Sequence, residues 1–101
     1  MATKGNNRRR RTLLFPVGAL VLSPGIDRLM RDGHLDPLPF LRRHVRGDWG
    51  DVTDERWQTN NAAVESGGLL ESLYIVHREL SIRIVTDADH SQTRVTVTSE
   101  R

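Results

Sequence analysis

The sequence predicts an α+β fold in which two or three short helices pack on an antiparallel sheet of three or four strands. Three observations lead to this prediction. Apolar residues recur at helical spacing within residues 24–66 and alternate with a period of two from residue 69 onward. A run of helices followed by a run of strands is typical of the α+β class. The length of 101 residues suits one domain with a modest core.

Two segments precede the helices. Residues 1–11, MATKGNNRRRR, offer almost nothing to bury and are predicted to form a disordered basic tail, which leaves 12–101 as a single domain. The apolar stretch that follows predicts a short strand or extended arm at Leu13–Phe15, a turn at Pro16–Gly18 and a second extended piece at Ala19–Leu22. Pro16 places this segment at a sheet edge or a bulge, so we expect it to add an edge strand. Because an exposed edge can pair with another chain, we expect a monomer or a homodimer.

Start and stop signals delimit three helices. Ser23, followed by proline, predicts the start of the first helix, and Gly33 predicts its end. Asp36, again followed by proline, predicts the second start, and Gly47 the second end. Thr53 is predicted to cap the third helix, whose first turn holds acidic residues where the helix dipole favours them. The residues predicted to face the core share helical spacing: Leu38, Leu41 and Val45 in the second helix, and Trp57, Asn61 and Val64 in the third.

Three strands complete the predicted meander. Alternating apolar residues place them at Leu73–His77, Leu80–Thr86 and Thr93–Thr98. A tight turn at Arg78-Glu79 joins the first two, and the polar loop Asp87–Gln92 joins the last two.

Composition excludes several classes of protein. No apolar run approaches the roughly 20 residues that span a bilayer. The chain has no cysteine, which excludes disulfides and thiolate metal sites and agrees with a cytoplasmic location. No kinase, hydrolase or dinucleotide fingerprint occurs, so we expect neither a cofactor nor contact with a membrane.

The basic charge is concentrated in the tail. Lys4 and the run Arg8, Arg9, Arg10 and Arg11 supply five of the fifteen basic residues, and the rest of the chain holds ten basic and thirteen acidic residues, a net charge of −3. A basic run of this kind binds phosphate without sequence preference, so the four arginines are candidate nucleic-acid contacts. An acidic body, in contrast, suits a protein partner better than an RNA substrate.

The stretch RRHVRGDWGDV, residues 42–52, has two interpretations. In the structural one, Gly47 and Gly50 adopt positive φ, Asp48 and Asp51 bond to nearby backbone amides, and Trp49 folds over the helix junction. This interpretation places His44 beside the apolar stripe of its helix.

In the functional interpretation, His44 transfers protons, Arg43 or Arg46 holds a phosphate, and Asp48 orients the imidazole ring. Asp89, in the polar loop TDADHSQT, is a further candidate binding residue beside Arg43, His44, Asp48 and Trp49. The histidines lie in unrelated segments, so no metal site is predicted.

The chain resembles a family of small bacterial proteins that are carried on plasmids, integrative elements and phage-derived islands and are labelled "plasmid-related". The family pattern is RH-x-x-GDWG, then N, then G and S-x-Y, then I-x-T-x-AD-x-S-x-T, and it corresponds to about residues 13–98 of this chain. The matching residues are Arg43, His44, Gly47, Asp48, Trp49 and Gly50; Asn60 or Asn61; Gly67 or Gly68; Ser72 and Tyr74; and Ile84, Thr86, Ala88, Asp89, Ser91 and Thr93. The resemblance implies a role on mobile DNA without supplying a reaction. Some members carry the name of a restriction–modification subunit, but this chain has no methyltransferase motif.

Three hypotheses for function follow. The first is a non-enzymatic module that binds a host or element-encoded protein, for example one belonging to a defence system. The second is a metal-independent ribonuclease, by analogy with small ribonucleases in which helices cover a meander. Its residues would be His44, Arg43, Tyr74, Thr86, Ser91, Thr93 and Arg94. The third is a nucleic-acid-binding accessory protein that uses the arginine tail.

Overall fold

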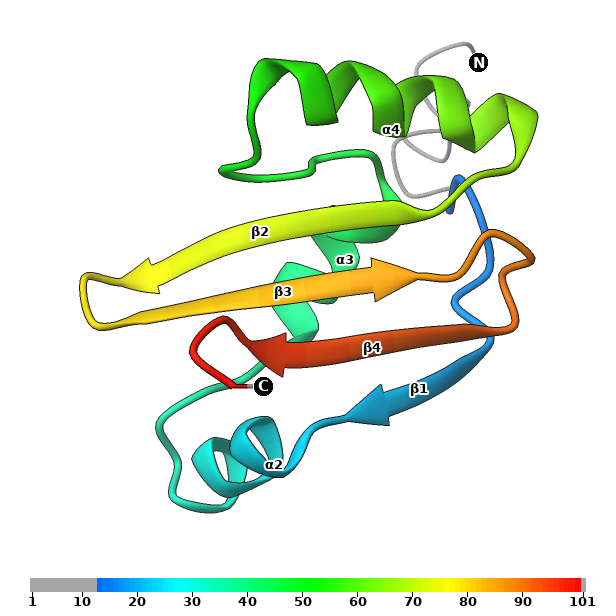
Figure 1. Cartoon of the computed structure of the whole chain (residues 1–101). Helices are drawn as coiled ribbons and strands as arrows, with labels where there is room; N and C mark the ends of the chain where they lie inside the picture. The colour runs from blue at the N-terminus through cyan, green and yellow to red at the C-terminus, as the bar shows by residue number, and fades with distance from the viewer. Residues whose placement is uncertain (1–12, 101) are drawn as a thin grey trace, which may run out of the picture.

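The computed structural model describes residues 13–100, and the predicted tail lies outside them. Three helices and one four-stranded sheet form an α+β fold (Figure 1). The elements, in chain order, are β1 (Ala19–Leu22), α2 (Pro24–Arg31), α3 (Leu38–Val45), α4 (Asp54–Ser66), β2 (Leu70–His77), β3 (Leu80–Thr86) and β4 (Gln92–Val97). No helix in this range is long and apolar enough to cross a membrane.

The sheet is mixed, with strand order β1-β4-β3-β2. The antiparallel meander β2-β3-β4 and the edge strand β1 are confirmed, but a wholly antiparallel sheet is wrong, because β1 runs parallel to β4. All three helices and two strands lie between β1 and β4 in the sequence. No tight hairpin therefore fixes their relative direction, and a long crossover permits parallel pairing. Leu13–Phe15, predicted as a short strand or an extended arm, forms no strand.

The last described residue fastens α2 to the end of the sheet. Ser23 caps α2 as predicted, with its Oγ accepting from the Ile26 amide at 3.2 Å. The Glu100 carboxylate accepts from Ser23 Oγ at 2.6 Å, from the Gly25 amide at 2.8 Å and from the Val97 amide at 2.7 Å. Donors at a helix N-terminus stabilise an anion, which lowers the pKa of Glu100. No sequence motif predicts this contact.

The core lies on one face of the sheet, which α3 crosses (Figure 1). Two apolar clusters fill it. The first contains Ile26, Leu35, Tyr74, Leu80, Ile82, Ile84 and Val95, and the second contains Phe15, Val45, Trp49, Ala63 and Leu70. In the strands, residues of this face alternate with partly exposed ones, as the period of two predicts.

The predicted helix faces are partly wrong. In α3, Val45 is buried, but Leu38 is exposed and the polar His44 is fully buried. In α4, Asn60 and Ala63 are buried, Trp57 and Val64 are half-buried, and Asn61 is exposed. Both errors have one cause: each helix turns a polar side chain inward because strands β2 and β3 offer it hydrogen-bond partners, and helical spacing carries no information about them.

Candidate functional site

The loop between α3 and α4 pairs with the outer edge of β2. Gly47 and Gly50 have φ of +85° and +78°, which confirms the predicted left-handed turns. The backbone between them runs beside Leu73, whose amide donates to the Trp49 carbonyl at 3.1 Å. The Leu73 carbonyl accepts from the Asp51 amide at 2.6 Å. The GDWGD segment, residues 47–51, therefore acts as a short extra strand.

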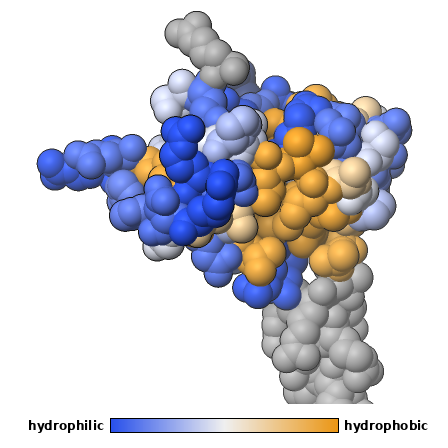
Figure 2. Space-filling model, turned by 90° about the horizontal axis from the view of Figure 1, so that it is seen from below, coloured by the Kyte–Doolittle hydropathy of each residue, from blue (hydrophilic) through white to orange (hydrophobic). Residues whose placement is uncertain are grey.

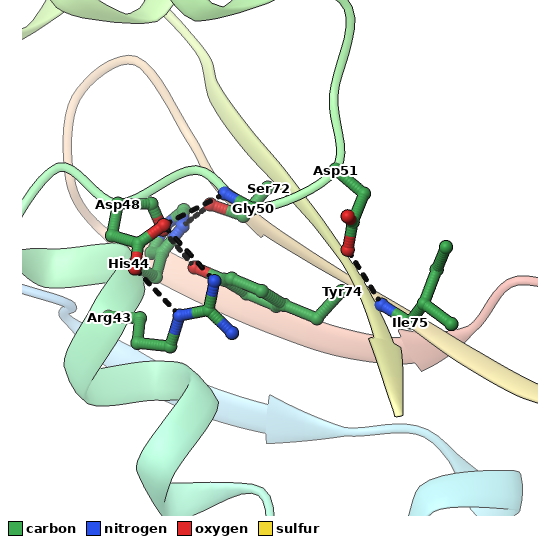
Figure 3. Close-up of polar contacts among 8 residues, drawn as sticks. All are labelled: Arg43, His44, Asp48, Gly50, Asp51, Ser72, Tyr74 and Ile75. Carbon is green, nitrogen blue, oxygen red and sulfur yellow. Dashed lines mark hydrogen bonds and ion pairs between the residues drawn. The ribbon is translucent and has the colours of Figure 1, made fainter. Parts of the chain in front are cut away.

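Two side chains extend this pairing along β2. Asn60 of α4 donates from Nδ2 to the Glu71 carbonyl at 2.8 Å and accepts at Oδ1 from the Glu71 amide at 3.2 Å. Asp51 accepts from the Ile75 amide at 3.0 Å (Figure 3), so its predicted local bond is wrong. Unpaired edge groups invite association with other chains. The loop and α4 thus close the β2 edge of the sheet.

Trp49 fixes the loop from the inside, as predicted. Its side chain is fully buried and stacks on Phe15 with ring centroids 6.2 Å apart. The His44 ring meets it edge-on at 5.5 Å. The indole Nε1 donates to Asn61 Oδ1 at 2.9 Å. An apolar body with a satisfied polar tip is the usual state of a buried tryptophan.

Arg43 and Asp48 form a bidentate ion pair on the rim of the loop. Arg43 donates from Nε and Nη2 to the two carboxylate oxygens, at 2.8 and 3.2 Å. Its guanidinium also lies 4.7 Å from the centre of the Tyr74 ring, and the Tyr74 hydroxyl donates to the Asp48 carbonyl at 2.6 Å. The bond from Arg43 lowers the pKa of Asp48, and burial raises the pKa of Tyr74. Arg43, a predicted phosphate holder, is already engaged by a carboxylate.

His44 lies at the head of a buried chain of polar groups. It is fully buried, with Nδ1 2.5 Å from Ser72 Oγ and Nε2 3.0 Å from Thr86 Oγ1. Thr86 Oγ1 lies 2.7 Å from Thr93 Oγ1, which donates to the Val17 carbonyl at 2.7 Å. Asp48, predicted to orient His44, bonds to Arg43, to the Gly50 amide and to none of these groups.

The direction of this chain fixes the tautomer of His44. A carbonyl only accepts, so the Thr93 proton goes to Val17, and Thr86 must donate to Thr93. Thr86 then accepts from Nε2–H of His44. In the neutral ring, Nδ1 therefore accepts from the Ser72 hydroxyl. Burial lowers the pKa of His44 to about 4.

The residues predicted for a ribonuclease do not converge at an accessible surface. His44, Tyr74, Thr86 and Thr93 are fully buried. Arg94 follows Thr93 in β4, so it lies on the opposite face of the sheet, where it pairs with Asp87 at 3.2 Å. Ser91 is an exposed loop residue whose amide donates to Asp89 at 3.0 Å. Arg8, Arg9, Arg10 and Arg11 fall outside the described residues.

Sequence reasoning undervalued two residues that organise the site, Ser72 and Asn60. Ser72 lies between Leu70 and Tyr74 on the buried face of β2. A polar residue at a core position of a strand was a signal that it had a buried partner. Asn60 gave no such signal, because its neighbour Asn61 occupies the predicted face.

Comparisons with protein-family models, with curated proteins and with solved structures find no match for this chain. The likeness to plasmid-related proteins stays a prediction. Within residues 13–100, no group of three or more His, Asp or Glu side chains could hold a metal ion. The site consists of the loop paired with β2, the buried hydrogen bonds of His44 and the exposed Arg43–Asp48 ion pair.

Gly50 tests the close approach of the loop to β2. A Cβ at Gly50 would overlap the Leu73 carbonyl and the Tyr74 ring, whereas one at Gly33, with a similar φ of +75°, would meet nothing. We expect Gly33→Ala to lower the free energy of unfolding by about 1 kcal/mol and Gly50→Ala to lower it by more than about 3 kcal/mol. Urea denaturation measures both, and equal losses would contradict the pairing.

Asn60 tests the closure of the β2 edge. Asn60→Asp keeps the acceptor for the Glu71 amide but sets a carboxylate oxygen against the Glu71 carbonyl. We expect a loss of about 2 kcal/mol in the free energy of unfolding. Asn61→Asp is the matched control, because the exposed Asn61 only accepts from Trp49 and a carboxylate accepts equally well. A control as damaging as Asn60→Asp would show that α4 tolerates neither change.

Because the pKa of His44 is lowered, we expect the protein to lose stability in mild acid. Its folded pKa of about 4 lies below the ordinary 6.5, so between these values only the unfolded chain binds the proton. The contribution of His44 to the free energy of unfolding is fully present above pH 6.5 and is lost as the pH falls to 4, a decrease of about 3 kcal/mol. Urea denaturation from pH 7 to 4 measures it. His44→Gln should flatten the profile, and the exposed control His34→Gln should not.

Proposed function

We propose that this protein is a small non-enzymatic module that binds another protein through an apolar surface beside β1. The observation that carries the proposal is the concentration of exposed apolar side chains on that side. Leu13 is 56% exposed, Leu38 51% and Leu20 44%. Figure 2, seen from the side on which β1 lies, shows one continuous apolar patch. Exposed patches of this kind mark sites of association.

The patch contains a groove between α3 and the segment that leads into β1. We call it the α3 groove; its lining residues are Leu13, Val17, Leu38, Leu41, Arg42 and Val45. All but one of these are apolar. Leu20 extends the patch, because it is paired with Thr93 and so points to the same face of the sheet as the core. The exposed side chains of Leu13, Leu20 and Leu38 form an apolar surface suited to a partner.

The arrangement of polar residues supports binding over catalysis. An acid–base catalyst must reach its substrate, but His44 is buried and has both ring nitrogens bonded within the protein. The arginines of the ribonuclease hypothesis are paired with Asp48 and Asp87. The nucleic-acid hypothesis rests on Arg8–Arg11, for which the described residues offer no support.

The kind of partner follows from the resemblance to plasmid-related proteins. A small binding module carried by a mobile element acts by engaging a protein of its host or of the element. A component of a defence system is a partner of this kind. This part of the proposal depends on the family likeness, whereas the binding surface depends on the exposed apolar residues.

Pull-down from a nuclease-treated bacterial lysate tests the proposal, with Leu38→Glu combined with Leu20→Glu as the variant. We expect the parent chain to retain a protein that this variant loses, because carboxylates in the patch oppose its burial. Ile75→Glu is the matched control, since Ile75 is 56% exposed but lies on β2 at the other edge of the sheet. Capture that is equal for all three chains, or absent from all, would contradict the proposal.

A further inference from the structure

The two edge strands of the sheet, β2 and β1, differ in whether other segments bond to their outer backbone groups. At the β2 edge, Asn60 and the backbone of the GDWGD segment bond to the outward N–H and C=O of Glu71 and Leu73, and Asp51 accepts from the Ile75 amide. At the β1 edge, Figure 1 shows no strand or helix beside the outer side of the strand. Natural proteins generally cover or charge an exposed edge. An edge left open beside an apolar patch therefore requires an explanation.

The outward backbone groups of β1 are identified by its bonds to β4. The Ala19 amide donates to Ser91 at 2.9 Å and the Ser23 amide donates to Val95 at 3.0 Å. In a parallel pair, alternate residues direct both N–H and C=O to the same neighbour. Leu20 and Leu22 therefore direct theirs away from the sheet, and no described loop or side chain bonds to them. The outer edge of β1 therefore presents the N–H and C=O groups of Leu20 and Leu22, two residues apart, as a pairing strand requires.

The positive charge near the β1 edge indicates which kind of partner segment can bind there. Arg42 lines the α3 groove, and Arg46 follows one helical turn later; both are exposed and form no ion pair with a described residue. Positive charge beside an apolar surface is complementary to carboxylates on a partner. A second copy would bring the same arginines to both sides of the contact, which opposes self-pairing.

We infer that β1 accepts an extended, acidic segment of the partner protein as a fifth strand. The inference rests on the proposed function and specifies how the partner binds. Backbone groups of the segment pair with Leu20 and Leu22, as in other cases of strand addition. Its alternate side chains are apolar and cover Leu20 and the α3 groove, and its carboxylates lie near Arg42 and Arg46.

Selection from a phage-displayed library of random 12-residue peptides, with the full chain as target, tests this inference. We expect enriched peptides that alternate apolar residues and contain Asp or Glu. Their affinity should fall by about tenfold between 0.05 and 0.5 M NaCl, because salt screens exposed charges. In hydrogen-exchange NMR, the Leu20 and Leu22 amides should become protected when peptide binds. The Asp48 amide, which bonds to Arg43 within the protein, serves as the internal reference.

Leu20→Pro isolates the backbone contribution. It removes one outward N–H and leaves the amides that bond to β4, and edge strands tolerate proline. We expect about tenfold weaker peptide binding than for Leu20→Ala, which keeps the N–H and loses the side chain. Protection of the Leu22 amide in the parent chain gives the same information without any substitution.

Several outcomes overturn the inference. Failure to enrich any peptide, or peptides that leave Leu20 and Leu22 unprotected, would refute strand addition; patch-dependent capture in the pull-down would still support the proposed function. Peptides without acidic residues would refute the acidic partner. Protection of both amides without peptide, together with a dimer in light scattering, would identify a second copy as the occupant.

Discussion

The buried polar chain from His44 to the Val17 carbonyl is the interaction on which the rest of the structure depends. It joins α3 to β2 through Ser72, to β3 through Thr86, and through Thr93 of β4 to the segment that enters β1. Each of these side chains has a hydrogen-bond partner, so burying the chain leaves none of its own polar groups unsatisfied. Fully paired networks of this kind specify one arrangement of the core. The position of α3 over the sheet is set by hydrogen bonds as much as by apolar contact.

The GDWGD segment depends on that arrangement and determines the character of the surface. Once His44 and Trp49 are buried, the chain leaves α3 beside β2, and the backbone of residues 49 to 51 pairs with Leu73. This closes one edge of the sheet. Among residues 13–100, no strand or helix pairs with the other edge, which is apolar and lies beside a groove with an exposed arginine. The contrast between a sealed edge and an open one supports a module that associates with another protein in a single orientation.

Predictions that depend only on residues close together in the sequence, such as helix caps and glycine turns, were confirmed. The Ser23 and Thr53 side chains cap their helices as predicted, and Gly47 and Gly50 adopt the positive φ for which glycine is suited. The meander followed from the alternation of apolar residues. Helix faces failed at Leu38 and Asn61, because burial of the polar neighbours His44 and Asn60 depends on partners about 11 to 42 residues away in the chain.

By itself, the sequence determined the α+β class, the order of helices before the meander, the turns and the edge position of β1, because caps, glycines and hydrophobic periodicity act within a few residues. Only the tertiary structure decided that β1 runs parallel to β4, that His44 is buried between Ser72 and Thr86, and that, within residues 13–100, one sheet edge is closed while the other is open. These features arise from pairing between distant segments, whose energy depends on geometry that no local pattern encodes.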